Sequence, residues 1–184
     1  MIGNQVDSVQ MLRDHIFPAV MGRFPGFIEG DFVVSIQQDN APAHVLSVAR
    51  DEEVRNDLEA LGLLGQIELS LQPAQSPDCN LNDLGLFNAI QAMYNEEEPT
   101  NSVEIIEYVT RCYWNYEVRK LNHMYLTMQS CMNCIIEAAG GNDYSIPHMG
   151  KERLERQGML PENIKVSKAA KETLERAGIF HIPE

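Results

Sequence analysis

The chain has 184 residues, of which 44% are hydrophobic and 22% charged, a composition typical of globular domains with enough apolar material for a core. The net charge is −13, and residues 1–100 carry 16 acidic but 4 basic side chains, which argues against an autonomous DNA-binding module. No apolar run approaches the ~20 residues of a membrane span, the first seven residues do not resemble a signal peptide, and four cysteines do not make a disulfide scaffold. We therefore expect an intracellular protein that is neither secreted nor membrane-bound.

The first part of the chain predicts helices alternating with strands. Residues 8–21 repeat apolar side chains at helical spacing, residues 22–30 form a turn rich in glycine, and residues 32–36 predict a strand whose two faces are both largely apolar. Residues 47–64 predict a helix, and residues 67–71 alternate as a second strand. A strand–helix–strand unit of this length predicts a parallel pair with a right-handed crossover.

The second part of the chain is predominantly helical. Residues 83–94 predict a helix that the acidic, proline-ended run Glu-Glu-Glu-Pro breaks. A long helical stretch covers residues 102–139, with a candidate break near Leu121, and two glycines stop it. Residues 144–184 predict a loosely packed tail with one short helix at residues 168–177.

Two short segments place carboxylates where an ordered element meets a turn. Residues 37–44 read Gln-Gln-Asp-Asn-Ala-Pro-Ala-His and put Asp39 just past the first strand; residues 76–83 read Ser-Pro-Asp-Cys-Asn-Leu-Asn-Asp and put Asp83 in the first turn of a helix. In open α/β sheets, ligands bind at the carboxyl ends of the strands. If the helix packs beside the strand, both acids can reach one divalent ion, since Mg²⁺ takes one or two carboxylates plus phosphate oxygens and water. Two such ions would support phosphoryl transfer.

Both aspartates also have a purely structural interpretation. An Asp after a strand is a common turn former, and an Asp in the first helical turn complements the helix dipole.

The residues around the two aspartates favour a functional interpretation instead. The octet at residues 37–44 and the run Gln-Pro-Ala-Gln-Ser-Pro-Asp-Cys-Asn-Leu-Asn-Asp-Leu-Gly-Leu-Phe-Asn-Ala-Ile-Gln at residues 72–91 resemble mariner-like transposases of the DDE/D superfamily, and most of all the branch common in plants and oomycetes. Residues 140–151 are similar to that family's C-terminal pattern, and the resemblance extends from residue 9 to residue 161.

The resemblance implies a role for each acidic motif. It gives Asp39 the role of the second catalytic acid and Asp83 that of the third, with Mg²⁺ or Mn²⁺ as cofactor and metal-dependent DNA strand cleavage and transfer at transposon ends, in the nucleus, as the activity. Asp78, in the same loop, is an alternative to Asp83, which we favour because a helix fixes its direction. Asn40 is expected to order the turn after Asp39. His44 either approaches substrate or metal or, as such histidines more often do, caps or packs.

The resemblance also implies an RNase H-like fold, which this chain would contain in part. Residues 1–98 would form an incomplete catalytic domain of two parallel strands with flanking helices, lacking the first three strands. A helical C-terminal extension at residues 99–143 and a loosely structured tail at residues 144–184 would follow. In the family the first catalytic Asp lies on the first strand, and no strand–Asp–strand pattern precedes Ser8. We therefore expect a truncated transposase with little or no strand-transfer activity alone.

The expected sheet predicts partners. Without its first strand, residues 32–36 would present an unpaired apolar edge, which favours self-association or association with a full-length transposase. Two other classes of function remain open. One is a hydrolase that uses Asp39 and Asp83 as an acid–base pair without metal. The other is a non-catalytic interaction protein that assembles with full-length transposase.

Two further groups of residues have competing interpretations. Cys131 and Cys134 have the C-x-x-C spacing of a zinc site, with Cys112 and His123 as conceivable partners upstream, but their helical setting favours buried apolar thiols. Four basic residues of the tail could contact phosphate, but the glutamates among them favour a solvated helix: Lys165, Lys168, Lys171 and Arg176.

Overall fold

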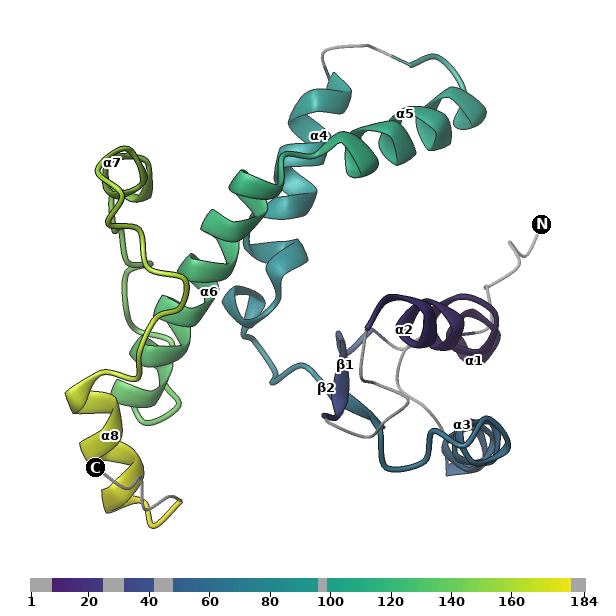
Figure 1. The fold of residues 1–184 in the computed structure, drawn as a ribbon, viewed down its shortest axis with the longest axis horizontal. Coiled ribbons are helices and arrows are strands. Elements are labelled where there is room, and N and C mark those ends of the chain that lie inside the picture. The colour runs from purple at the N-terminus through teal and green to yellow at the C-terminus, as the bar shows by residue number, and fades with distance from the viewer. Residues whose placement is uncertain (1–7, 25–31, 42–47, 96–98, 180–184) are drawn as a thin grey trace. The chain divides into compact units, whose positions relative to one another are not determined.

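The computed structural model describes residues 8–24, 32–41, 48–95 and 99–179. Contacts along the chain divide it into two compact units, residues 1–74 and residues 75–184, which are described separately (Figure 1). The fold is mixed α/β, mostly helical with a two-stranded parallel sheet, as expected. Within the described ranges, no helix combines the length and the apolar composition that a membrane crossing requires. The expected boundaries at residues 98 and 143 stay a prediction.

The first unit alternates helices and strands in the predicted order. Its elements are α1 (Ser8–Met11), the π-helical turn η1 (Leu12–Ile16), α2 (Phe17–Arg23), β1 (Val34–Gln38), α3 (Val48–Ala60) and β2 (Ile67–Leu71). The helix expected at residues 8–21 and the strand expected at residues 67–71 are confirmed. The helix expected at residues 47–64 is present as α3 but ends at Ala60, four residues earlier than expected. The first strand begins and ends two residues later than expected, so that it includes Gln37 and Gln38.

Strands β1 and β2 pair in parallel, with Val34 opposite Ile67 and Gln38 opposite Leu71. On one face Val34, Ile36, Ile67 and Leu69 pack against the core of this unit. The alternate positions, which point to the other face, are polar: Ser35, Gln37, Glu68 and Ser70. The expectation that both faces of the first strand are apolar is therefore wrong. The observed strand does not include Phe32 and Val33, which were expected to begin it, and it ends instead with Gln37 and Gln38.

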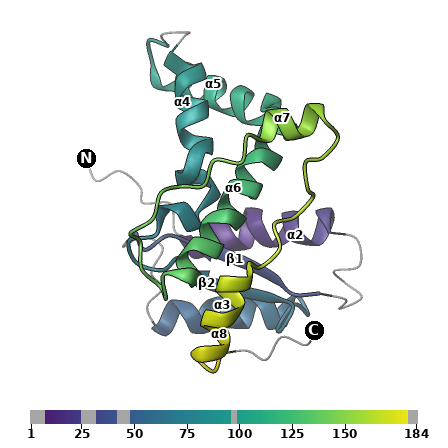
Figure 2. The same cartoon turned by 90° about the vertical axis from the view of Figure 1, so that its left-hand side faces the viewer.

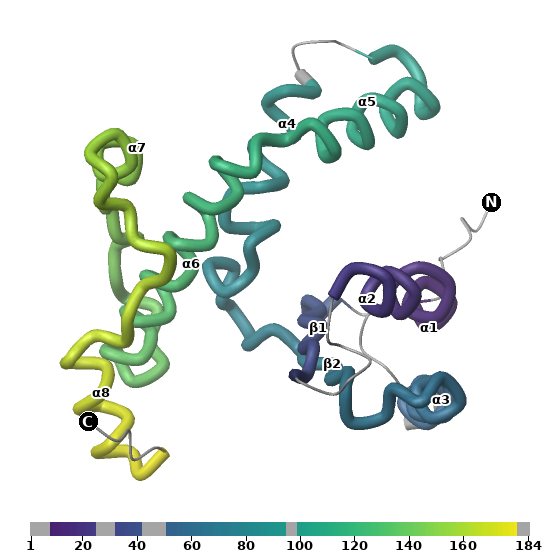
Figure 3. The backbone as a smooth tube through the Cα atoms, in the orientation of Figure 1, coloured from purple at the N-terminus to yellow at the C-terminus, as the bar shows by residue number. Residues whose placement is uncertain are grey.

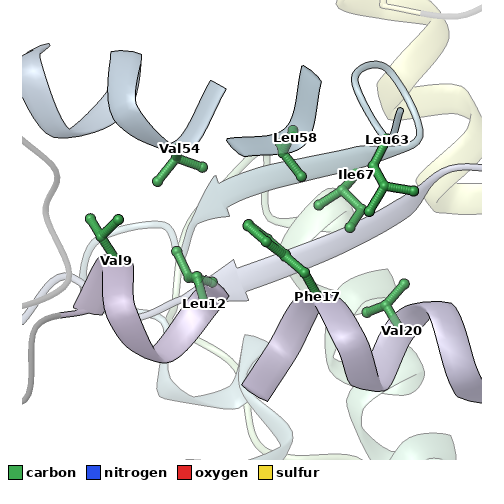
Figure 4. Close-up of a cluster of buried hydrophobic side chains, with 8 residues drawn as sticks. All are labelled: Val9, Leu12, Phe17, Val20, Val54, Leu58, Leu63 and Ile67. Carbon is green, nitrogen blue, oxygen red and sulfur yellow. The ribbon is translucent and has the colours of Figure 1, made fainter. Parts of the chain in front are cut away.

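The core of the first unit lies between its helices and one face of the sheet (Figure 4). Helices α1 and α2 with the turn η1 contribute Val9, Leu12, Phe17 and Val20, and α3 contributes Val54 and Leu58. The Phe17 side chain is completely buried. Outside this core, Arg13 donates from Nε to Asp57 Oδ2 at 2.8 Å and from a terminal nitrogen to Glu53 Oε1 at 2.7 Å, so an ion pair joins η1 to α3.

The second unit is helical (Figure 2). Its elements are the short turn η2 (Pro77–Cys79), the π-helical turn η3 (Asn82–Leu86), α4 (Phe87–Asn95), α5 (Ser102–Asn115), α6 (Val118–Glu137), α7 (Lys151–Arg156) and α8 (Lys168–Arg176). The helix expected at residues 83–94 is confirmed as η3 and α4 together. A core formed by Leu86, Ile90 and Cys112 joins η3 and α4 to α5.

The long helical stretch breaks earlier than expected. Tyr116 and Glu117 are extended, with ψ of 134° and 118°, so α5 ends at Asn115 and α6 begins at Val118 (Figure 3). No Gly or Pro marks this break, which is why the sequence pattern did not place it. Tyr116 packs against the core of the second unit, and Glu117 pairs with Lys120 at 2.7 Å. Tertiary packing therefore determines where the helix is interrupted.

The tail contains more order than the sequence predicted. The short helix expected at residues 168–177 is confirmed as α8, and α7 is a second helix in this segment. Side chains of α6 hold the backbone between them: Gln129 Oε1 accepts from Ile164 N at 2.7 Å, and Asn133 Nδ2 donates to Lys165 O at 3.0 Å. Ser167 caps α8 by accepting from Ala170 N, and its hydroxyl also donates to Glu137.

Candidate functional site

Asp39 lies immediately after β1, at the carboxyl end of the parallel pair. Its side chain is half-buried, and Oδ1 accepts a hydrogen bond from the backbone N–H of Ala41 at 2.9 Å. Asp commonly forms a local turn in this way, by accepting a hydrogen bond from the backbone N–H of the residue two positions further along the chain. The turn former and the candidate metal ligand are thus the same residue, and the turn fixes the direction of the carboxylate.

Asn40 anchors this turn to the neighbouring strand. Its side-chain Nδ2 donates to the backbone carbonyl of Gln72 at 2.6 Å, one residue past the end of β2. The backbone N–H of Gln72 in turn donates to Gln38 O at 2.7 Å and extends the ladder of the sheet. Asn40 thus ties the residue after Asp39 to the end of β2, and its role in ordering the turn stays a prediction.

Asp83 lies in the π-helical turn η3, and its side chain is exposed. Asn80 braces it, because Asn80 Nδ2 donates to Asp83 Oδ2 at 3.0 Å while Asn80 Oδ1 accepts from Asn82 N at 3.0 Å. A β-carbon built on Gly85 would lie 3.3 Å from Met124 Cε, so η3 packs closely on α6 at this glycine. Single π-helical turns occur frequently at functional sites. The hydrogen bond from Asn80 thus holds the Asp83 carboxylate, while the side chain stays accessible to solvent.

Asp78, the alternative third acid, has a different environment. It lies in η2, which packs on α6, and its side chain is half-buried. The pKa of Cys131 is raised to about 11, first by burial of the thiol and then by the negative charge of Asp78. Burial, and then the same charge, also raises the pKa of Cys79. The carboxylate of Asp78 thus acts on the thiols around α6.

The structure does not bring the candidate residues together within one unit. Asp39 and Asn40 belong to the first unit, and Asp78 and Asp83 belong to the second. His44 lies outside the described residues. In the described parts of the chain, no cluster of three or more His, Cys, Asp or Glu side chains is arranged to hold a metal ion. The donor chemistry still suits a hard cation, since Asp39 and Asp83 supply carboxylate oxygens.

The cysteines of α6 agree with the structural interpretation. Cys131 is completely buried and Cys134 is half-buried, and burial is the first cause of the raised pKa of both thiols. Zinc binds the thiolate, which a raised pKa disfavours. Cys112 is also buried, within the core of the second unit.

Sequence reasoning missed a basic pocket beside α7. Its basic lining comes from a short helix that we expected to be part of a loose tail: Lys151, Arg153 and Arg156. The basic residues considered in the sequence lie further along the tail, at Lys165 and in α8. The available signal was the run Lys-Glu-Arg-Leu-Glu-Arg at residues 151–156, which begins at the end of the segment similar to the family's C-terminal pattern.

A scan against protein-family models and searches of curated proteins and of solved structures find no significant match to this chain.

Proposed function

We propose that this chain is part of the catalytic domain of a mariner-like DDE/D transposase with an RNase H-like fold, in which Asp39 and Asp83 bind Mg²⁺ or Mn²⁺. The observation that carries the proposal is the placement of Asp39 at the carboxyl end of a parallel strand pair, where α/β sheets form ligand sites. The order strand, Asp39, helix, strand, loop and Asp83 agrees with the resemblance. DNA, at transposon ends, is the proposed substrate, and the nucleus is the proposed location.

Each residue of the proposed site has its own task. Asp39 presents a carboxylate whose direction is fixed by the contact to Ala41, and Asn40 holds that turn on β2. Asp83 presents an exposed carboxylate on a helical turn, braced by Asn80. Divalent metal, when bound, activates the attacking oxygen and stabilises the leaving oxygen in phosphoryl transfer. Two carboxylates hold metal less firmly than three, so we expect residues 1–184 alone to cleave DNA weakly or not at all.

Calorimetric titration with Mn²⁺ tests the proposal. Asp39→Asn and Asp83→Asn are each expected to weaken binding about tenfold or more, since each removes one charged ligand. Asp51→Asn, at an exposed position of α3, and Asp143→Asn, at an exposed position of the second unit, are matched controls that should leave binding unchanged. Asp78→Asn decides between the two candidates for the third acid. Absence of Mn²⁺ binding, or equal effects of the controls, would contradict the proposal and leave the metal-free hydrolase as the next candidate.

A second candidate function, a non-catalytic interaction protein, is favoured by one observation. An apolar groove of about 640 Å³ lies between α4 and α5, and aromatic side chains that line it are unusually exposed: 58% for Phe87 and 62% for Trp114. Exposed apolar surface of this kind marks protein-binding sites. We propose a full-length transposase that contains this same segment as the occupant, because two copies of one apolar surface form a self-complementary contact.

The molar mass in solution tests this candidate. We expect wild-type chain to self-associate at micromolar concentration and to co-purify with the full-length transposase, and Trp114→Ser to weaken both. Val118→Ser is the control, because Val118 is 70% exposed and does not line the groove. A monomeric wild-type chain that fails to co-purify would remove this candidate without affecting the metal site.

A further inference from the structure

A polar pocket of about 450 Å³ lies between α6 and α7, together with the segment that leads into α7. Helix α6 contributes His123, and the other polar side chains come from the tail: His148, Lys151, Glu152, Arg153 and Arg156. All of these residues belong to the second unit, so the pocket is formed within one compact part of the chain. It is independent of the candidate metal ligands Asp39 and Asp83.

The charge of this pocket contrasts with that of the chain. Its lining holds three basic side chains, Lys151, Arg153 and Arg156, and one carboxylate, Glu152, in a protein whose net charge is −13. The nearby carboxylate of Glu155 already accepts from Arg119 at 2.9 Å. No ion pair joins Lys151, Arg153 or Arg156 to a carboxylate among the described residues. A pocket with surplus positive charge attracts anions.

The hydrogen-bond donors of the pocket exceed its acceptors. His148 Nδ1 accepts from the backbone N–H of Gly150 at 3.2 Å, which assigns the ring proton of neutral His148 to Nε2, where it can be donated. His123 Nε2 is buried 3.3 Å from Glu155 Oε2, but it has no hydrogen-bond partner of acceptable geometry in the described part of the chain. A buried ring nitrogen of this kind is costly unless a partner is supplied.

Lys151 adds a partly desolvated cation. Its Nζ donates to Thr127 Oγ1 at 2.6 Å, which uses one of the three ammonium donors. Burial lowers the pKa of Lys151, because the charged form loses contact with water. An anion in the pocket would offset this loss of hydration and would accept hydrogen bonds from the remaining ammonium donors.

We propose that this pocket binds a phosphate group, supplied either by the backbone of a nucleic-acid strand or by free phosphate or a nucleotide. Phosphate matches the pocket in charge and in its number of acceptor oxygens, and arginine pairs with it through two parallel hydrogen bonds. The proposal does not depend on metal binding at Asp39 and Asp83.

Binding is measured with two probes, inorganic phosphate and a fluorescently labelled single-stranded oligonucleotide, with EDTA present so that metal ions play no part. Arg153→Gln and Arg156→Gln are each expected to lower affinity about tenfold, since each removes a charge-assisted contact to the anion. Lys171→Gln, an exposed residue of α8 away from the pocket, is the matched control and should change affinity less than about twofold. Circular dichroism checks that all variants fold.

The outcomes separate the sources of the phosphate group. The first outcome is that the oligonucleotide binds and that both arginine variants weaken its binding. The slope of the logarithm of the binding constant against the logarithm of salt concentration should then become shallower by about one for each phosphate contact removed. This outcome supports the pocket and assigns it to nucleic acid. Binding of inorganic phosphate alone, with the same ranking of variants and shifted ring signals of His123 and His148 in nuclear magnetic resonance spectra, supports the pocket and assigns it to free phosphate. Binding of neither probe, or equal weakening by Lys171→Gln, overturns the proposal. That result would leave the proposal of Mn²⁺ binding at Asp39 standing.

Discussion

The side chain of Asn40 donates a hydrogen bond of 2.6 Å to the backbone carbonyl of Gln72 and thereby joins the ends of the two parallel strands. The preceding residue, Asp39, forms the turn that places Asn40 in this position. The end of the sheet, the turn and the candidate carboxylate of Asp39 are consequently linked by hydrogen bonds. Any change that releases Asn40 should loosen both the sheet end and the direction of the Asp39 carboxylate.

Asn40→Ala should lower the free energy of unfolding of the first unit by about 1–2 kcal/mol, the usual cost of a partly buried hydrogen bond. Urea denaturation followed by circular dichroism measures the change. Asn56→Ala on α3 is the matched control, because Asn56 is exposed and alanine favours the helix, so its effect should be neutral or stabilising. Equal destabilisation by both variants would show that the contact to Gln72 contributes nothing.

Phe17→Ala should be the more severe change. Phe17 is completely buried in the core of the first unit, and removal of a buried aromatic ring costs about 3–5 kcal/mol. Phe24→Ala removes the same ring at a position that is 45% exposed and should cost about 1 kcal/mol. Amide hydrogen exchange in α3 and β2 reports on this unit directly. Equal protection in the two variants would contradict the assignment of the core.

The sequence was most informative where a local pattern coincides with packing. The alternation at residues 67–71 gave the bounds of β2 correctly, and the two strands are parallel as the intervening helix predicted. The turn at Asp39 was also predictable, because Asp commonly accepts a hydrogen bond from the backbone N–H two residues on, here that of Ala41. These features depend on few residues close together in the chain.

Features that depend on tertiary contacts were not predictable. The break at Tyr116 has no glycine or proline, and it follows from packing on the core of the second unit. The order of the tail depends on Gln129 and Asn133, whose amide side chains bind backbone more than 30 residues away. The pocket at Lys151 was missed because His123 joins it from α6, and no local pattern connects the two.

Alkylation should distinguish the cysteines of α6. Burial raises the pKa of Cys131 to about 11, so at pH 8 roughly a thousandth of this thiol is in the reactive thiolate form. Iodoacetamide is expected to modify the half-buried Cys79 and Cys134 well before Cys131. Mass spectrometry of native protein over time gives the order. Modification of Cys131 at the rate of Cys134, or stoichiometric zinc that blocks both, would show that the structural interpretation of this pair is wrong.

The start of α5 should depend on pH through Glu104. Asn101 caps the helix by accepting from the backbone N–H groups of Val103 and Glu104, while the Glu104 carboxylate accepts from the backbone N–H and the hydroxyl of Thr100, both at 2.9 Å. The contacts to Thr100 lower the pKa of Glu104 below its ordinary value of 4.5. Because the folded pKa is the lower one, the stabilising contribution is complete above pH 4.5 and is lost as the pH falls through the folded pKa.

The amide resonance of Thr100 should therefore titrate with a midpoint below 4.5 and follow the carboxyl signal of Glu104. Glu104→Gln should abolish that titration, and amide exchange in the first turn of α5 should then become faster at neutral pH, because the amide is a weaker acceptor than the carboxylate. Glu107→Gln, an exposed change in the same helix, should leave the Thr100 titration intact. A Thr100 midpoint that follows Glu107 instead would mean that the start of α5 is held by Asn101 alone.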